Sequence, residues 1–182
     1  MDRPRLATVW LGGCSGCHMS FLDLDEFLLE LAQRVDLVFS PILDVKEYPR
    51  DVDLCLVEGA VCNQEHLEMA HRIRERTRCV ISFGDCAVTG NVSAIRNQLG
   101  LNNAQNVLQR AYVQNADLNQ QIPETNGIVP ALLERVMPLH EVIHIDYFLP
   151  GCPPPAARIK SFLVQLLEGK TPVLTGTDIK FG

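Results

Sequence analysis

Four of the seven cysteines lie in short segments that contain glycine, where their thiols could bind a metal. Cys14 and Cys17 are a close pair in the sequence GGCSGC, whereas Cys86 and Cys152 lie singly in SFGDCAVTG and LPGCPPP. Cysteine thiolates are common ligands of zinc and of iron–sulfur clusters. A close pair at this spacing can also form a redox-active disulfide. The chemistry of the pair therefore depends on where the two single cysteines lie.

Apolar, β-branched runs alternate with segments of helical period, which predicts a parallel sheet covered by helices. The predicted strands cover residues 6–11, 35–40, 52–57, 79–83 and 142–148. A first helix is predicted from about Ser20, because Ser20 and Asp23 have the spacing of a capping box. Further helices are predicted after Asn63 and from about Pro154 to Glu168. We expect one α/β domain over residues 1–182, which is long enough to bury a core.

The four cysteines all follow the ends of predicted strands. In a parallel sheet these ends lie at one edge, and ligands bind there near the point where the strand order reverses. The thiols are therefore expected to converge on a metal site. A redox disulfide would leave Cys86 and Cys152 without a role, and structural zinc sites usually use two close pairs. One close pair with two single cysteines favours a single [4Fe–4S] cluster.

Four glycines next to these cysteines are predicted to take part in cofactor binding: Gly13, Gly16, Gly84 and Gly151. A residue without a side chain lets the backbone approach a cluster closely. Exposed backbone amides can then donate hydrogen bonds to its sulfides, which helps to set the reduction potential.

Other polar and sulfur-containing residues near these segments have more than one interpretation. Glu58 ends the third predicted strand, where its carboxylate could relay protons, contact a partner, or be an ordinary acid at a strand end. His18 follows the close pair and could contact a partner, hydrogen-bond the cluster, or be solvated. Cys62 is expected to pack near the cluster without binding it. Cys55 and Cys79 lie within predicted strands and are expected to be small buried hydrophobic residues.

The overall charge and composition exclude several classes of protein. With 16 basic and 22 acidic residues, the net charge of −6 is unlike that of a nucleic-acid-binding protein. The sequence contains no run of 18 apolar residues, so no membrane-spanning helix is predicted. The start of the chain resembles neither a secretory signal nor a twin-arginine leader, so we expect a cytoplasmic location. In that reducing compartment, cysteines more often bind metals than form structural disulfides.

Residues 91–139 depart from the alternation of strands and helices. They are rich in Asn and Gln and show one short helical pattern, around residues 107–113. Two interpretations remain open for this segment: a solvated connection, or an insertion at one end of the sheet that docks a partner.

Four motifs together resemble the small subunit of [NiFe]-hydrogenases: CSGC at 14–17, VEG at 57–59, GDCA at 84–87 and PGCPP at 150–154. The resemblance covers about the whole chain. It implies a flavodoxin-like domain in which Cys14, Cys17, Cys86 and Cys152 bind the proximal [4Fe–4S] cluster. It also implies that Glu58 lies near the cluster and the large subunit.

The chain is most similar to the short, cytoplasmic branch of this family, because no cysteines follow Cys152 to bind further clusters. The bidirectional NAD-linked hydrogenase is the expected type. Its implied partners are a nickel–iron large subunit, which carries out the catalysis, and diaphorase subunits with flavin and iron–sulfur clusters. This chain would then relay electrons between them, without contact with a membrane or nucleic acid.

Three alternatives stay open at this point. Small subunits of methanogen-type cytoplasmic hydrogenases share much of the first motif. The quinone-linked cluster subunit of complex I has a similar PGCPP segment, but typically carries adjacent cysteines where this chain has CSGC. Flavodoxin-like proteins often bind FMN in the same crevice, although the loop after the first strand here holds cysteines rather than a Ser/Thr-rich phosphate site, so FMN is not predicted.

Overall fold

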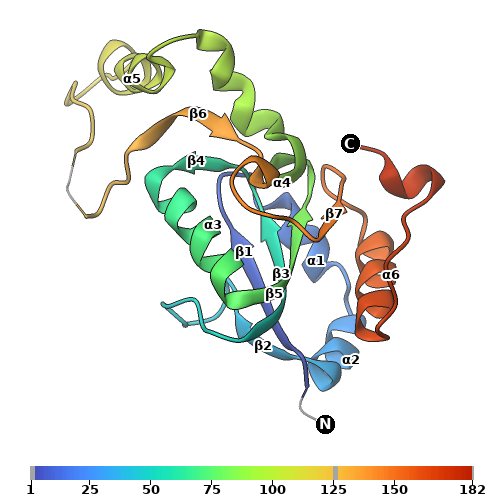
Figure 1. The fold of residues 1–182 in the computed structure, drawn as a ribbon. Helices are drawn as coiled ribbons and strands as arrows, with labels where there is room; N and C mark the ends of the chain where they lie inside the picture. The colour runs from blue at the N-terminus through green and yellow to red at the C-terminus, as the bar shows by residue number, and fades with distance from the viewer. Residues whose placement is uncertain (1–2, 125–126, 182) are drawn as a thin grey trace.

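A five-stranded parallel sheet forms the centre of the molecule (Figure 1). The computed structural model describes residues 3–124 and 127–181. The strands are β1 (Arg5–Trp10), β2 (Asp36–Phe39), β3 (Val52–Glu58), β5 (Thr77–Phe83) and β7 (Tyr147–Leu149). Their order is β2-β1-β3-β5-β7 and every neighbouring pair is parallel. This is the flavodoxin-like strand order, and the predicted α/β fold is confirmed.

Helices cover both faces of the sheet (Figure 1). The helices of one face are α1 (Gly16–Leu22), α2 (Phe27–Arg34) and α6 (Ala156–Leu167), and α3 (Gln64–Arg76) covers the other. Each face of the sheet has its own hydrophobic core, and successive residues of β3 point into the two cores alternately. Leu56 packs with α6, whereas Val57 packs with α3. Burial on both faces explains the continuous apolar strands that the sequence shows. Among the described residues, no helix is both long and apolar enough to cross a membrane.

The prediction for the first helix was wrong in its start and in its cap. The helix begins at Gly16 rather than Ser20, and the helical region is divided into α1 and α2. Ser20 lies inside α1, where its buried Oγ donates a hydrogen bond to the carbonyl oxygen of Pro154 at 2.6 Å. That hydrogen bond links α1 to the segment that follows β7. Ser20 therefore makes a tertiary contact and does not cap a helix.

The strand predicted over residues 142–148 was also wrong in extent, because only Tyr147–Leu149 forms β7. A 3₁₀ helix, η3 (Leu139–Glu141), and an irregular segment precede it. Ile143 and Ile145 are buried in the core without belonging to a strand. Asp146 pairs with Val80 of β5 through its backbone N–H (3.0 Å) and through its carboxylate (2.8 Å), which replaces part of the sheet pairing.

The described residues of the segment 91–139, namely 91–124 and 127–139, form a substructure at the end of the sheet where the strands terminate (Figure 1). Its elements are a 3₁₀ helix η1 (Asn91–Leu99), α5 (Asn103–Gln109), a π-helix η2 (Arg110–Gln114) and β6 (Leu132–Met137). A short α-helix, α4 (Asp85–Thr89), precedes the segment. β6 pairs antiparallel with β4 (Val61–Asn63). The helical pattern predicted at 107–113 falls on α5 and η2, whereas β6 was not predicted. Residues 1–2, 125–126 and 182 of the expected domain lie outside the described residues.

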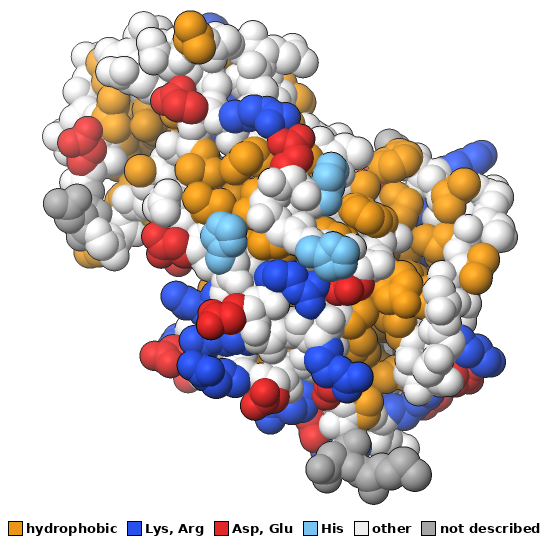
Figure 2. Space-filling view, in the orientation of Figure 1, with side chains coloured by type: hydrophobic (Ala, Val, Ile, Leu, Met, Phe, Trp, Pro, Cys, Tyr) orange, Lys and Arg blue, Asp and Glu red, His pale blue; other side chains and the backbone are white. Residues whose placement is uncertain are grey.

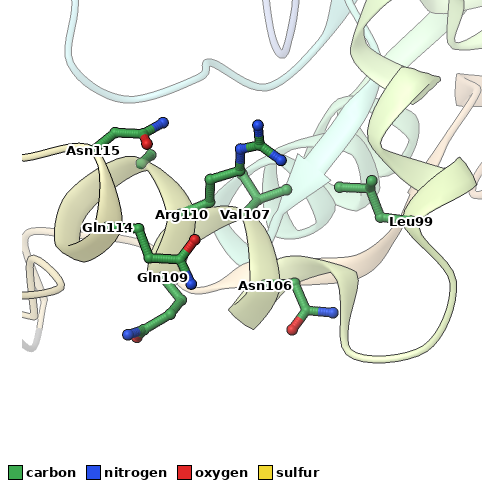
Figure 3. Close-up of a pocket in the computed structure, with 8 residues that line it drawn as sticks. Leu99, Asn106, Val107, Gln109, Arg110, Gln114 and Asn115 are labelled. Atoms are coloured by element: carbon green, nitrogen blue, oxygen red, sulfur yellow. The ribbon is translucent and has the colours of Figure 1, made fainter.

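The surface of this substructure is mainly uncharged. Figure 2 shows charged side chains gathered over the half of the molecule that holds α3 and the amino ends of the strands. The substructure carries an open pocket of about 500 Å³ between Leu99 and the helices α5 and η2, lined by amides such as Asn106 and Gln109 (Figure 3). None of the residues that line it is a cysteine. Docking of a partner on this segment stays one of its two interpretations, beside a solvated connection.

Tyr48 anchors the long loop between β2 and β3, and its removal should destabilise the fold. The side chain is fully buried, its hydroxyl lies 2.7 Å from Thr77 Oγ1, and its ring packs edge-on against Phe39. We expect Tyr48→Phe to lower the free energy of unfolding by about 1 kcal/mol. Tyr48→Ala should lower it by about 3–5 kcal/mol, because it also leaves a cavity. Urea unfolding followed by circular dichroism measures both effects.

The control is Tyr112→Phe, because Tyr112 is exposed and its loss should change the unfolding free energy by less than about 0.5 kcal/mol. Equal effects of Tyr48→Phe and Tyr112→Phe would show that the buried hydroxyl contact contributes nothing.

Candidate metal centre

Four cysteines from different parts of the sequence line one cavity at the carboxyl edge of the sheet. Cys14 and Cys17 follow β1 at the start of α1, Cys86 lies in α4 after β5, and Cys152 follows β7. The cavity measures about 70 Å³. It lies where the strand order reverses, since β1 has β2 on one side and β3 on the other. The structure therefore brings together all four of the predicted cysteines.

The four thiols differ in their exposure and influence one another electrostatically. Cys17 and Cys86 are buried, whereas Cys14 and Cys152 are exposed. Burial raises the pKa of the Cys17 thiol far above its usual range, and the negative charges of Glu58 and of the other three cysteines raise it further. Burial and the charges of Cys14 and Cys152 likewise raise the pKa of Cys86. Thiolates crowded in this way need the positive charge of bound metal to stay ionised.

The donor set fits an iron–sulfur cluster. The four thiols line one cavity, and a cluster in which each cysteine binds a different iron needs four thiols gathered at one place.

The predicted glycines occupy two kinds of position. Gly16 and Gly151 line the cavity itself. Gly84 supports its wall, since a Cβ atom there would lie 2.1 Å from Cys17 Sγ, and its φ of +81° is one that favours glycine. Gly13 does not line the cavity, and a Cβ atom there would lie 3.3 Å from Gly59 Cα and 3.8 Å from Cys86 Cβ. The close approach of the backbone at Gly84 is therefore required for Cys17 to adopt its position.

Glu58 and His18 form a pair beside the cavity that sequence reasoning missed. Glu58 is buried and lines the cavity, and its Oε1 and Oε2 accept hydrogen bonds from the backbone N–H groups of Cys17 (3.3 Å) and His18 (2.9 Å). His18 Nδ1 lies 2.5 Å from Glu58 Oε2. The His18 side chain is only 15% exposed and packs edge-on against Phe83, so the solvated interpretation of this residue was wrong.

Asp85 is a second residue that sequence reasoning missed. Its Oδ1 accepts a hydrogen bond from the Gly151 N–H at 2.6 Å, and its own N–H donates to the Gly151 carbonyl oxygen at 3.0 Å. Asp85 thereby joins the segment of Cys86 to the segment of Cys152. An acidic residue one glycine after a buried, apolar strand was the available signal, because such a carboxylate needs hydrogen-bond donors when it is buried.

The remaining cysteines do not line the cavity. Cys62 is half-buried, its Sγ contacts the carbonyl oxygen of Ala60, and it packs against Gly12. Cys55 is fully buried, as predicted, whereas Cys79 is half-buried.

Comparison with known proteins identifies the family. The family described as NADH ubiquinone oxidoreductase, 20 kDa subunit, matches residues 14–166. The chain is 39% identical over 172 residues to the delta subunit of the NAD-reducing hydrogenase HoxS of Cupriavidus necator, covering 91% of this chain and 79% of that protein. It is 36% identical over 185 residues to a subunit of the F420-non-reducing hydrogenase of Methanothermobacter marburgensis, covering 98% of this chain and 58% of that protein.

A solved structure agrees with these relatives. The crystal structure of an NAD+-reducing [NiFe]-hydrogenase in the H2-reduced state contains a chain with a TM-score of 0.92 and 37% identity, and the match covers 100% of both chains. The [NiFeSe]-hydrogenase of Dm. baculatum, at 16% identity and a TM-score of 0.61, shares the fold. This chain spans 58–59% of the length of the methanogen relatives that match it first.

The chain belongs to the family of the NADH ubiquinone oxidoreductase 20 kDa subunit. Within that family it is a small subunit of the [NiFe]-hydrogenase type, as its cysteine motifs predict.

Proposed function

We propose that this chain is the electron-transfer subunit of an NAD-linked [NiFe]-hydrogenase in the cytoplasm. In this proposal, Cys14, Cys17, Cys86 and Cys152 bind one [4Fe–4S] cluster, which would store and pass on one electron at a time. The observation that carries the proposal is the set of four thiols around one cavity at the strand ends. The similarity to hydrogenase subunits, among them one of an NAD-reducing hydrogenase, supports it.

The reaction H2 ⇌ 2H+ + 2e− would take place in another chain, a nickel–iron large subunit. Diaphorase subunits with flavin and iron–sulfur clusters would use the two electrons to reduce NAD. The exposed side of the cavity, at Cys14 and Cys152, is where a partner subunit would shield the centre from water. The buried Cys17 and Cys86 are already shielded from water by this chain.

The pair of Glu58 and His18 is proposed to hold the first turn of α1, and thereby Cys17, against the cavity. Glu58→Ala would leave the backbone N–H groups of Cys17 and His18 without acceptors. Each unsatisfied N–H group should cost about 1–3 kcal/mol of folding free energy. We therefore expect Glu58→Ala to lower the iron content of the purified complex. Glu58→Gln keeps an acceptor oxygen and should restore most of the iron. Metal analysis and EPR amplitude measure both variants.

The matched control is Glu65→Gln, which changes an exposed glutamate at the start of α3 and should leave iron and activity unchanged. Full iron content in Glu58→Ala would contradict the holding role. Slower H2 turnover in Glu58→Gln at unchanged iron content would instead support the proton relay considered from the sequence.

The function is tested by anaerobic recovery of the complex through this chain, followed by assays of H2-dependent reduction of a viologen dye and of NAD. Reduction of both supports the proposal. Reduction of the dye alone would keep the hydrogenase and exclude NAD as the acceptor, which would favour the methanogen-type alternative. Absence of both activities, with quinone-linked subunits recovered instead, would contradict the proposal and favour the complex I relative.

A further inference from the structure

Two of the first three residues of η1 contact segments that carry the cysteines of the cavity. Asn91 Nδ2 donates to Cys152 Sγ at 3.4 Å. Ser93 Oγ donates to the carbonyl oxygen of Gly12, two residues before Cys14, at 2.8 Å. The sulfur of Cys152 therefore accepts a side-chain hydrogen bond from η1.

The backbone at Asn91 is held in a conformation that suits asparagine. Its φ is +32° and it follows Gly90, whose φ is +85°. Among non-glycine residues, asparagine tolerates the left-handed region best. The Asn91 N–H also donates to Thr89 Oγ1 at 3.3 Å, and the Gly90 N–H donates to the Cys86 carbonyl oxygen at 2.9 Å. The turn from α4 into η1 thus fixes the amide of Asn91 next to Cys152.

An N–H group that points at a cysteine sulfur stabilises negative charge on that sulfur. A cluster gains one negative charge on reduction, so such a hydrogen bond favours the reduced state and raises the reduction potential. The Asn91 contact uses a side chain, and substitution can remove it without altering a ligand.

We propose that Asn91 is a positioning residue that raises the reduction potential of the cluster through its hydrogen bond to the Cys152 sulfur. This inference rests on the proposed function, because it requires a cluster bound by Cys152. It goes further in assigning control of the potential to a residue that is not a ligand.

The test is an EPR-monitored redox titration of the intact complex with Asn91→Gly and Asn91→Asp. Asn91→Gly keeps the backbone conformation and removes the donor, so the midpoint potential should become more negative. Asn91→Asp keeps the shape but replaces the donor by a negative charge, so its shift should be larger in the same direction. The control is Asn106→Asp, which makes the same change of charge on exposed α5 and should leave the potential unchanged.

Each outcome separates this inference from the proposed function. A wild-type complex without the EPR signal of a [4Fe–4S] cluster would contradict the proposed function itself. A normal signal with unchanged midpoint potentials in both variants would overturn the role of Asn91 alone. Loss of the signal from both variants would also overturn it, because Asn91 would then be needed for assembly of the centre rather than for its potential.

Discussion

Replacing Cys17 by serine is expected to abolish H2-dependent reduction of NAD by the complex and to remove the EPR signal of the cluster. Cys17 is buried and lines the cavity, and Gly84 and Glu58 fix its position. A serine hydroxyl is a far weaker ligand for iron than a thiolate, and among the described residues no other cysteine lines the cavity besides its three proposed partners. Serine at each of those partners, Cys14, Cys86 and Cys152, should likewise abolish or convert the cluster.

Cys62→Ser provides the matched control. Cys62 lies close to the Gly12 turn but outside the cavity, so its replacement should leave the EPR signal and the turnover unchanged. An intact [4Fe–4S] signal with full turnover in any of the four ligand variants would contradict the assignment of that cysteine. Loss of the signal in Cys62→Ser would show that the ligand set differs from the one proposed.

Gly84→Ala should be nearly as damaging, although it removes no ligand. The added methyl group would lie 2.1 Å from Cys17 Sγ, so the sulfur must leave its present position. The φ of +81° with a ψ of +163° adds a backbone cost of about 1–3 kcal/mol for any residue other than glycine. We expect loss of most of the cluster iron and of most of the H2-dependent activity, measured by metal analysis and dye reduction.

Gly100→Ala separates the two effects. Gly100 has a similar φ of +77°, but an added methyl group there would meet open space. This control should show the backbone cost alone, as a small loss of stability with full iron content. Equal iron content in the two variants would show that the approach of Gly84 to Cys17 does not position the sulfur.

The convergence of the cysteines could be predicted because it follows from topology. Each of the four comes just after an apolar strand, and the carboxyl ends of parallel strands always meet at one edge. The β-branched runs and the alternation with helices were enough to locate the strands β1, β2, β3 and β5 to within about two residues. No contact between particular side chains had to be known.

The contacts around the cavity could not be predicted, because each depends on neighbours that are distant in the sequence. Glu58 meets His18 only because β3 lies next to β1, where Trp10 is paired with Glu58. Asp85 meets Gly151 across a strand pairing that involves only three residue pairs. The polar segment after Gly90 showed no helical pattern at its start, so nothing placed Asn91 beside Cys152.

The strand predicted over residues 142–148 shows a limit of the same kind. Its apolar residues are buried, as the pattern indicates, but burial alone does not require a strand. The Asp146 carboxylate takes the hydrogen bond that a longer strand would have taken from the Val80 N–H. Hydrophobic periodicity cannot reveal that a short polar side chain replaces a backbone acceptor and so ends the strand pairing.

The central claim, that this chain holds one [4Fe–4S] cluster on four cysteines, is tested most directly by a difference measurement on the intact complex. Iron per complex and the EPR spectrum under H2 are compared between the wild-type chain and Cys17→Ser. We predict a loss of about four iron atoms per complex, or about one if a three-iron cluster remains, together with loss of one [4Fe–4S] signal. Equal iron content and identical spectra in the two complexes would contradict the claim.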